Sequence, residues 1–392
     1  MQYKKFQDLK LSTLGMGNMR LPTTEERGPI DREPARKIIE HAYESGINYF
    51  DTAYRYHGGE SEPFVGEVLS QYPRDSFSLA SKLPGHMMTY ADGKLGFKGY
   101  LSGETFNSPS EIFEDQLKRC QVEYFDFYLL HNLAETSIDF YMNEELGIVD
   151  YLLEQKKAGR IRHLGLSAHA QADTLEKFLN WRDDFEFVQL QLNYMDWTLQ
   201  NAKRKYKVAT EHNLPVIVME GVRGGKLADL GEENNALLKA ARPDASIASW
   251  AFSVLQSIPN VTVVLSGMTT LEQLEENIET FSHPQPTNEE ENALLQQIIN
   301  EMMDLVPCTA CEYCLEACPQ ELNIPGLIAM YNEGKSVDNP GLLRFALGAM
   351  SPEELPSACI ACGDCMALCP QDIQIPDVLE KFDQLIQEKN LI

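Results

Sequence analysis

Short runs of aliphatic, β-branched and aromatic residues alternate with longer amphipathic stretches between about residue 10 and residue 281. This alternation is typical of βαβ units, in which a buried parallel strand is followed by a helix. Eight parallel strands with intervening helices predict an α/β fold, a (β/α)8 or TIM barrel, whose reactive groups sit at the carboxyl ends of the strands. The eight predicted strands are Leu11–Leu14, Asn48–Asp51, Ser78–Ser81, Phe125–Leu130, His163–Ser167, Phe187–Gln191, Val216–Met219 and Val261–Leu265.

Two segments lie outside this repeat. A strand pair at Tyr3–Phe6 and Lys10–Ser12 is predicted to close the base of the barrel. A connection of about 26 residues, Leu83–Ser108, joins the third strand to the third helix, and loops of that length are usually functional or disordered. We consider two roles for it, a substrate lid and a loop that packs against an added domain. The lid hypothesis rests on its aromatic residues, which are Tyr90, Phe97, Tyr100 and Phe106.

The repeat ends at Ser282–Thr287, a segment with two prolines. We therefore predict a barrel domain at residues 1–281, a linker at 282–290 and a smaller, mostly helical domain at 291–392. Helical patterns at Pro325–Tyr331 and Gly341–Met350 support the last assignment. A chain of 392 residues is long enough for one large barrel and one such module.

Charge and hydropathy exclude several classes of partner. The chain has 59 acidic and 33 Lys and Arg residues, so its net charge of −26 repels nucleic acid and anionic lipid. No apolar run approaches the length of a membrane-spanning helix, and no apolar stretch follows the basic residues at the start. We expect a soluble cytoplasmic protein with no nucleic-acid or membrane partner.

The cysteines are concentrated in the smaller domain. Of nine in the chain, eight lie between Cys308 and Cys369, and only Cys120 lies elsewhere. Such clustering indicates a metal site rather than a disulfide framework. Cys120 falls in a helical stretch and is predicted to be a small core residue.

Two copies of the motif CxxCxxCxxxCP account for these eight cysteines. The first copy is Cys308, Cys311, Cys314 and Cys318, and the second is Cys359, Cys362, Cys365 and Cys369. This is the run of bacterial two-cluster ferredoxins, in which the fourth cysteine ligates the other cluster. We therefore predict two [4Fe–4S] clusters, one held by the first three cysteines of the first motif with Cys369, the other by those of the second motif with Cys318. Zinc is disfavoured because zinc ribbons use paired CxxC arms.

About 40 residues separate the two motifs, and in this the domain resembles the helical two-cluster ferredoxin modules of larger oxidoreductases. Two roles for the clusters stay open at this point. They transfer electrons, or they hold a small helical domain together.

Several motifs at the ends of predicted strands carry a second resemblance. They are Phe50-Asp51-Thr52-Ala53-Tyr54-Arg55-Tyr56, Ser81-Lys82-Leu83 and Tyr124-Phe125-Asp126-Phe127-Tyr128-Leu129-Leu130-His131. Across residues 1–281 the chain resembles the aldo/keto reductase family. The resemblance implies a catalytic tetrad of Asp51, Tyr56, Lys82 and His131, with no member missing.

These residue types suit carbonyl reduction by hydride transfer. The developing alkoxide needs a proton donor, and Tyr56 can serve if a nearby cation eases its ionisation. Lys82, paired with Asp51, would supply that field. His131 would orient the carbonyl and stabilise its oxygen through a hydrogen bond.

The resemblance also implies a nicotinamide cofactor, NAD(P)H. Ser167 and Gln189 match residues with which the family holds the carboxamide, whereas Ala168 replaces its asparagine. Met219 falls where the family has a stacking aromatic residue. Glu276 and Asn277 match the residues that read the adenosine end. The positions that clasp a 2′-phosphate in NADPH-preferring members are Gly267 and Gln273 here, which favours NADH.

Three glycine-containing segments are assigned by their place in the barrel. Pyrophosphate in such barrels commonly binds at the loops after strands seven and eight. We assign this role to the turn Gly221–Gly225 after the seventh strand, which includes Gly221, Val222, Arg223 and Gly224, and to Ser266–Thr270 after the eighth, because both offer small residues and open N–H groups. Near the N-terminus, Gly17 and Met19 are predicted to line the barrel mouth. The segment that contains them begins like a GxGxxG fingerprint, but Arg20 stands in place of the third glycine and no helix follows.

These features predict an NAD(P)H-dependent oxidoreductase for small carbonyl substrates, aldehydes or ketones, with an iron–sulfur module. The alternative is an electron-transfer component whose barrel is a docking platform with altered or lost nicotinamide chemistry. Nicotinamide gives up two electrons as hydride and each cluster accepts one, so a flavoprotein or other redox partner is a further expectation. The last 102 residues have 16 acidic and 4 basic residues, net −12. An acidic surface of this kind suits a basic docking face on the redox partner. The alternative is an acidic surface that is only solvated.

Overall fold

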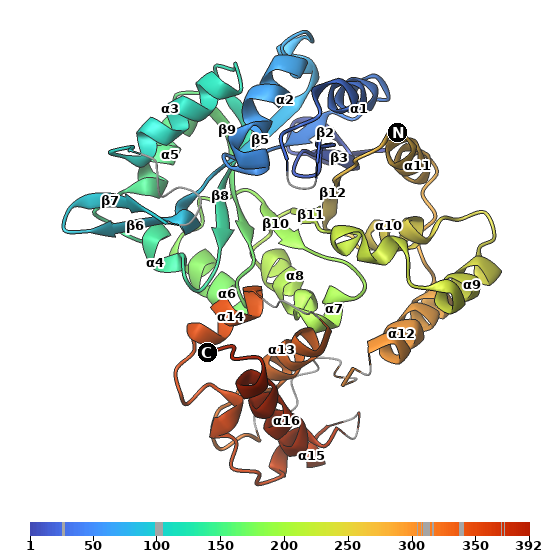
Figure 1. Cartoon of the computed structure of the whole chain (residues 1–392). Helices are drawn as coiled ribbons and strands as arrows, with labels where there is room; N and C mark the ends of the chain where they lie inside the picture. The colour runs from blue at the N-terminus through green and yellow to red at the C-terminus, as the bar shows by residue number, and fades with distance from the viewer. Residues whose placement is uncertain are drawn as a thin grey trace.

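We used a computed structural model of the whole chain. It describes all residues except 26–27, 99–104, 304, 307, 309–313, 316, 337–340, 370 and 372. A large barrel forms the upper body of the molecule and a smaller helical domain lies below it (Figure 1). In the described part of the chain no helix is both long and apolar enough to span a membrane.

Eight parallel strands close into a barrel in the order β10-β11-β12-β3-β4-β5-β8-β9, which confirms the predicted fold class. The apolar runs of the sequence become these strands because their side chains are buried on both faces. The strands are β3 (Leu14–Gly17), β4 (Tyr49–Asp51), β5 (Ser78–Leu83), β8 (Phe125–Leu133), β9 (Ile161–Ala168), β10 (Val188–Gln191), β11 (Val216–Met219) and β12 (Val261–Ser266).

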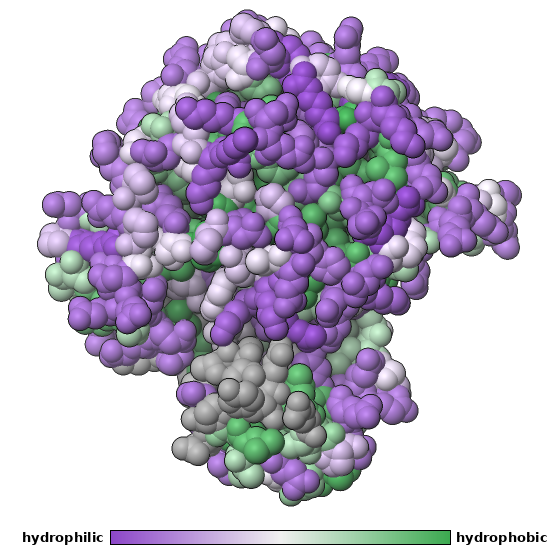
Figure 2. Space-filling view, turned by 180° about the vertical axis from the view of Figure 1, so that it is seen from behind, coloured by the Kyte–Doolittle hydropathy of each residue, from purple (hydrophilic) through white to green (hydrophobic). Residues whose placement is uncertain are grey.

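Amphipathic helices surround the barrel, each with its apolar stripe against the strands. They are α1 (Arg32–Glu44), α2 (Ser61–Leu69), α3 (Pro109–Arg119), α5 (Ile148–Lys157), α6 (Ala172–Trp181), α8 (Ala202–Glu211), α10 (Ile247–Gln256) and α11 (Leu271–Ser282). Shorter or additional helices in the connections are α4 (Ile138–Tyr141), α7 (Asp196–Leu199) and α9 (Glu232–Ala241). Polar residues cover most of the rear face of the barrel, and apolar residues appear mainly in its depressions (Figure 2).

The predicted hairpin closes the base of the barrel. Strands β1 (Tyr3–Phe6) and β2 (Leu9–Ser12) pair antiparallel, and Phe6 enters the barrel interior. Its ring lies edge-on to Phe127, with ring centroids 5.1 Å apart. The first barrel strand, predicted at Leu11–Leu14, instead begins at Leu14 and pairs with β12. The apolar pattern runs from β2 into β3 without a break. It therefore does not show where the chain leaves the antiparallel hairpin and enters the parallel barrel.

The long third connection contains a hairpin that we did not predict. Strands β6 (Met88–Ala91) and β7 (Lys94–Phe97) pair antiparallel across an Asp92-Gly93 turn in which both residues have positive φ. This dipeptide is a strong hairpin signal. Phe97 packs on Phe106 with ring centroids 6.3 Å apart, and the cavities described below are lined by neither ring. Tyr100 of the proposed lid lies outside the described residues.

The linker leads into a helix that packs on the barrel. Helix α12 (Glu289–Met303) buries Leu295, Ile298 and Ile299 in a cluster with Trp250 and Leu238 of the barrel side. The predicted boundary at residue 291 assigns most of this helix to the second domain, but its apolar face is covered by the first.

The smaller domain has its own apolar core, formed largely by two helices. Helices α13 (Ile324–Ser336) and α16 (Ile375–Glu388) contact each other through residues such as Leu327 and Phe382. The shorter α14 (Gly341–Gly348) and α15 (Asp364–Ala367) complete the described helices of this domain. Helix α13 packs on α7 of the barrel (Figure 1).

Candidate active site

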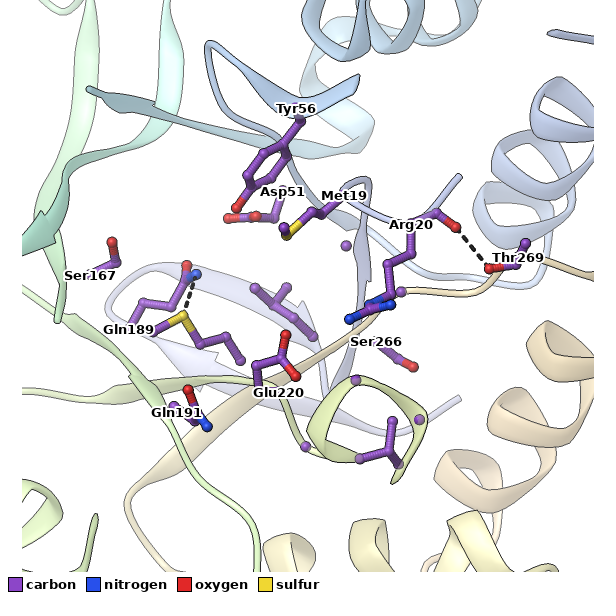
Figure 3. A pocket seen from close by; sticks show the side chains of 18 of the residues that line it. Met19, Arg20, Asp51, Tyr56, Ser167, Gln189, Gln191, Glu220, Ser266 and Thr269 are labelled. Carbon is purple, nitrogen blue, oxygen red and sulfur yellow. Dashed lines mark hydrogen bonds between the residues drawn. The ribbon is translucent and has the colours of Figure 1, made fainter. Parts of the chain in front are cut away.

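A cavity of about 790 Å³ opens at the carboxyl ends of the barrel strands. Barrels of this type carry their reactive groups at this face, because the loops that follow the strands converge there. Figure 3 shows Asp51 and Tyr56 on one side of the cavity, Gln189 and Gln191 on another, and Arg20 with Thr269 at a third edge.

The four residues of the implied tetrad come together at one wall. Asp51 ends β4, Lys82 lies in β5 and His131 in β8, while Tyr56 opens a short turn after β4. Lys82 Nζ donates to Asp51 Oδ1 at 2.6 Å and to Tyr56 Oη at 3.2 Å. Its side chain is 0% exposed. Lys82 is therefore fixed behind the reacting groups, and Asp51, Tyr56 and His131 face the cavity.

The pKa of Tyr56 differs from the expectation that Lys82 eases its ionisation. Burial alone would lower the pKa of Lys82, but Asp51 and Tyr56 raise it above its ordinary value, so the ammonium is charged. The pKa of Tyr56 is raised from 10.0, because burial outweighs the opposing effect of Lys82. Lys82 thus limits the rise rather than producing a net fall, and Tyr56 holds its proton at neutral pH.

His131 is neutral in this site. Burial, followed by His86, Lys82 and His169, lowers its pKa well below the ordinary value. Its ring lies edge-on to Tyr56, with ring centroids 6.1 Å apart. A neutral imidazole beside a protonated phenol gives the site two groups that can donate hydrogen bonds to one carbonyl oxygen.

The opposite wall suits a primary amide. Gln189 Nε2 contacts the sulfur of Met219 at 3.5 Å, while its Oε1 is buried with no hydrogen-bond partner among the described residues. Ser167 Oγ accepts the backbone N–H of Asn132 at 2.8 Å, which leaves its own hydroxyl proton for a ligand. An unpaired acceptor facing a cavity is costly unless a ligand satisfies it, so this wall fits the carboxamide of nicotinamide.

The remaining predicted cofactor residues also face the cavity, with one exception. Those that line it are Gly17, Met19, Gly221, Val222, Gly224, Glu276 and Asn277. The exception is Arg223, whose guanidinium points away into ion pairs with Asp196 at 2.8 Å and Glu333 of α13 at 2.5 Å. A cation buried there needs carboxylate partners, and these come from the second domain and α7. The Arg223 side chain therefore does not form part of the cavity wall, and the assignment of this turn to the cofactor concerns its backbone N–H groups.

Arg20 is a cavity residue that the sequence analysis did not assign. Arg20 follows β3. Any side chain in place of Gly224 or Gly267 would collide with the side chain of Arg20. The two glycines therefore leave room for a guanidinium between the loops after β11 and β12. The position of Arg20 after the first strand was the available signal, because all such loops meet at the barrel mouth.

Cysteines of both motifs meet in the smaller domain. Cys318 of the first motif and Cys359, Cys362 and Cys365 of the second line one small cavity together with apolar neighbours such as Leu379. Burial raises the pKa of Cys365, and the nearby thiols raise it further. Thiols in such a place ionise when a cationic metal centre compensates their charge. The donor set therefore fits the crossed ligation predicted for the second cluster.

The other cysteine set is described in part. Cys308, Cys314 and Cys369 pack in or against the core of this domain, whereas Cys311 lies outside the described residues. No group of three or more potential ligands in the described part of the chain converges closely enough to hold a single metal ion. Cys120 is buried in the barrel core, as expected, where burial raises its pKa far above the ordinary value.

Comparison with known proteins agrees with both halves of the molecule. Residues 13–300 match the Aldo/keto reductase family and residues 307–373 match a 4Fe-4S dicluster domain. An uncharacterized oxidoreductase of Bacillus subtilis is 26% identical over 314 residues, which is 73% of this chain and 92% of the relative. The NADH-specific methylglyoxal reductase of Escherichia coli is 25% identical over 312 residues, or 69% and 90% of the two chains.

A solved structure supports the same assignment. The holo form of an aldo-keto reductase from Bacillus halodurans, 26% identical, superposes with a TM-score of 0.60 and covers 76% of this chain and 96% of its own. The chain therefore belongs to the aldo/keto reductase family and is an oxidoreductase with a 4Fe-4S dicluster domain at its C-terminal end.

Proposed function

We propose that this protein reduces small aldehydes or ketones with NADH. The observation that carries the proposal is the hydrogen-bonded set of Asp51, Lys82 and Tyr56 at the wall of a cavity that is also lined by Gln189, whose Oε1 has no hydrogen-bond partner among the described residues. The cofactor, when bound, supplies the hydride that goes to the carbonyl carbon. The protein's own part is to position the carbonyl and to supply the proton.

Tyr56 and His131 both donate to the carbonyl oxygen in this proposal. Because hydride addition places negative charge on that oxygen, the Tyr56 proton moves to it as the alcohol forms. Lys82 stabilises the phenolate left behind, and Asp51 keeps Lys82 in place and charged. His131 needs no proton change, since it is neutral throughout.

The cofactor would lie along the cavity from Gln189 to the loops after β11 and β12. Gln189 and Ser167 would hold the carboxamide, and the turn from Gly221 to Gly224 would approach the pyrophosphate through backbone N–H groups. Gly267 and Gln273 offer no cation for a 2′-phosphate, and an Escherichia coli relative is named as NADH-specific. Both observations support NADH over NADPH.

Arg20 gives this placement a direct test. Arg20→Met should weaken NADH binding about tenfold or more, because a hydrogen bond to a charged group is lost from the pyrophosphate side. Fluorescence titration of NADH measures the change. Arg36→Met on the outer face of α1 is the matched control and should bind NADH as wild type does. Equal affinity of all three proteins would remove Arg20 from the cofactor site.

The pKa directions predict an unusually flat pH profile. Because the pKa of Tyr56 is raised above 10.0 and that of His131 is far below 6.5, neither group titrates between about pH 6 and pH 9. We expect kcat/KM for carbonyl reduction to be constant over that range and to fall only above about pH 10, as the proton donor ionises. A clear inflection near neutrality would contradict the neutral His131.

Turnover itself separates this proposal from the docking-platform alternative. Anaerobically purified protein with NADH should reduce members of an aldehyde and ketone panel. The loss of NADH absorbance measures this reaction. An inactive platform should neither bind NADH nor consume it. A protein that binds no nicotinamide and reduces no member of the panel would refute the proposed function.

A redox role for the dicluster domain completes the proposal. Clusters held by its cysteines, when bound, supply one-electron chemistry, so exchange with a two-electron hydride donor calls for a flavoprotein partner. In stopped-flow measurements, NADH and substrate should change the cluster absorbance once a flavoprotein is added. Absorbance that never responds, with every flavoprotein tried, would leave the clusters a structural role.

A further inference from the structure

A second cavity lies between the barrel and the smaller domain. Its volume is about 540 Å³, and α13 and α14 of the smaller domain form one of its walls. His86, Met87, His169 and Leu342 line both this cavity and the active-site cavity, so the two adjoin. A ligand with its carbonyl at Tyr56 can therefore extend into space that the barrel alone does not enclose.

One residue of this cavity is a buried cation. Lys205 lies on α8, and only 4% of it is exposed. Among the described residues its ammonium has no hydrogen bond and no ion-pair partner within 4.0 Å. An ammonium taken from water without a partner at contact distance is costly in free energy. A ligand anion in the cavity would provide that partner.

The neighbouring carboxylates do not serve as that partner. Burial lowers the pKa of Lys205, and Glu135, Asp196 and Glu333 oppose that shift from a distance. Each of the three already has a partner. Asp196 and Glu333 pair with Arg223 at 2.8 and 2.5 Å, and Glu135 accepts the backbone N–H of Gln171 at 2.8 Å. None of the three carboxylates lies within 4.0 Å of the Lys205 ammonium, and Arg223 offsets part of their charge. Lys205 therefore keeps its capacity to bind an anion, although Glu135 and Glu333 line the same cavity.

Other groups around the cavity suit the same ligand. Burial lowers the pKa of His86 and of His169 to about 4, so both rings are neutral, and Nδ1 of His169 has no partner within the described part of the chain. Lys98 adds a second, exposed cation at the edge. Leu342, with 45% of its surface exposed, presents an apolar side chain at the border of the two cavities.

We propose that the interdomain cavity binds the anionic end of the carbonyl substrate, with a carboxylate or phosphate group on the ammonium of Lys205. An apolar spacer would then lie along Leu342 and Met87, and the carbonyl would reach Tyr56 in the first cavity. The substrate class is an oxo acid or a phosphorylated carbonyl compound. This inference rests on the proposed function, and it makes α13 and α14 of the smaller domain part of the substrate site.

Matched substrates test the proposal kinetically. A series of ω-oxo carboxylic acids of increasing length is compared with the methyl esters of the same acids. Wild type should prefer acid to ester in kcat/KM by roughly 10- to 100-fold at the best length, as expected for a hydrogen bond to a charged group. Lys205→Met should lose this preference through a higher KM for the acid, and leave the ester unchanged.

Control variants separate the charge from general damage. Lys203→Met changes an exposed lysine on the same helix and should keep the acid preference. Lys205→Arg retains a cation at this position and should keep part of the acid preference. Leu342→Glu adds a negative charge at an exposed position that tolerates it, and should lower the acid preference even if Lys205→Met fails to fold.

Calorimetry distinguishes this proposal from the function on which it rests. Unreactive alkanoates and alkyl phosphates should bind to wild type and to Tyr56→Phe, but not to Lys205→Met, and the tighter of the two probes identifies the head group. If no carbonyl compound is reduced yet these probes bind through Lys205, the proposed function fails and the anion site stands. Equal binding to wild type and Lys205→Met, or equal kinetics for acid and ester, would overturn the site.

Discussion

Replacing Tyr56 by phenylalanine is expected to abolish carbonyl reduction while NADH binding stays nearly intact. The change removes the proton donor but keeps the ring against the cavity, and loss of a general acid typically costs on the order of 10² to 10⁴ in rate. Steady-state kinetics on the best substrate of the panel measures the loss, and fluorescence titration checks the cofactor affinity.

A neighbouring tyrosine is the matched control for this change. Tyr54 is buried, its Oη donates to Asp115 at 3.3 Å, and it does not line the cavity. Tyr54→Phe should therefore retain the wild-type rate. If Tyr56→Phe keeps most of its activity, another group supplies the proton and the proposed roles of Lys82 and Asp51 fail with it.

Replacing Cys318 by alanine should remove one cluster. Although Cys318 belongs to the first motif, the lost cluster should be that of the second motif. The anaerobic protein is expected to contain about eight iron atoms, four for each cubane, and Cys318→Ala about four. The reason is the position of Cys318 in the cavity that Cys359, Cys362 and Cys365 line. Iron and sulfide analysis measures the loss.

Spectra assign the lost cluster. The electron paramagnetic resonance spectrum of reduced Cys318→Ala should match that of Cys362→Ala and differ from that of Cys308→Ala. Cys120→Ala, which changes a core cysteine outside both motifs, should keep both clusters. A Cys318→Ala spectrum that matches Cys308→Ala instead would show that each motif ligates its own cluster.

Wherever one periodic pattern filled a whole element, the sequence was sufficient to predict it. The strand Val216–Met219 was predicted with its observed ends, and the repeat of eight strand-helix units fixed the barrel. The cysteine spacing likewise identified the dicluster domain, since three of the four ligands of each cluster lie close along the chain. These features depend on residues that are close together in the sequence, so the sequence alone is enough to predict them.

The register at the barrel base and the packing of α12 required the tertiary structure. Leu11 and Leu14 belong to one apolar run but to different sheets, and the helix around Ile298 is amphipathic whichever domain covers it. Hydrophobicity records that a side chain is buried, but it does not record which surface buries it.

The sites divide in the same way. Residues at strand ends, such as Asp51 and Lys82, could be predicted because parallel strands bring their carboxyl ends together in every barrel. Arg223, which joins Asp196 and Glu333, and Lys205, which meets the smaller domain, could not. Whether a cation faces a cofactor, an ion pair or a cavity depends on the charges and walls that distant segments place around it, and only the folded chain fixes those positions.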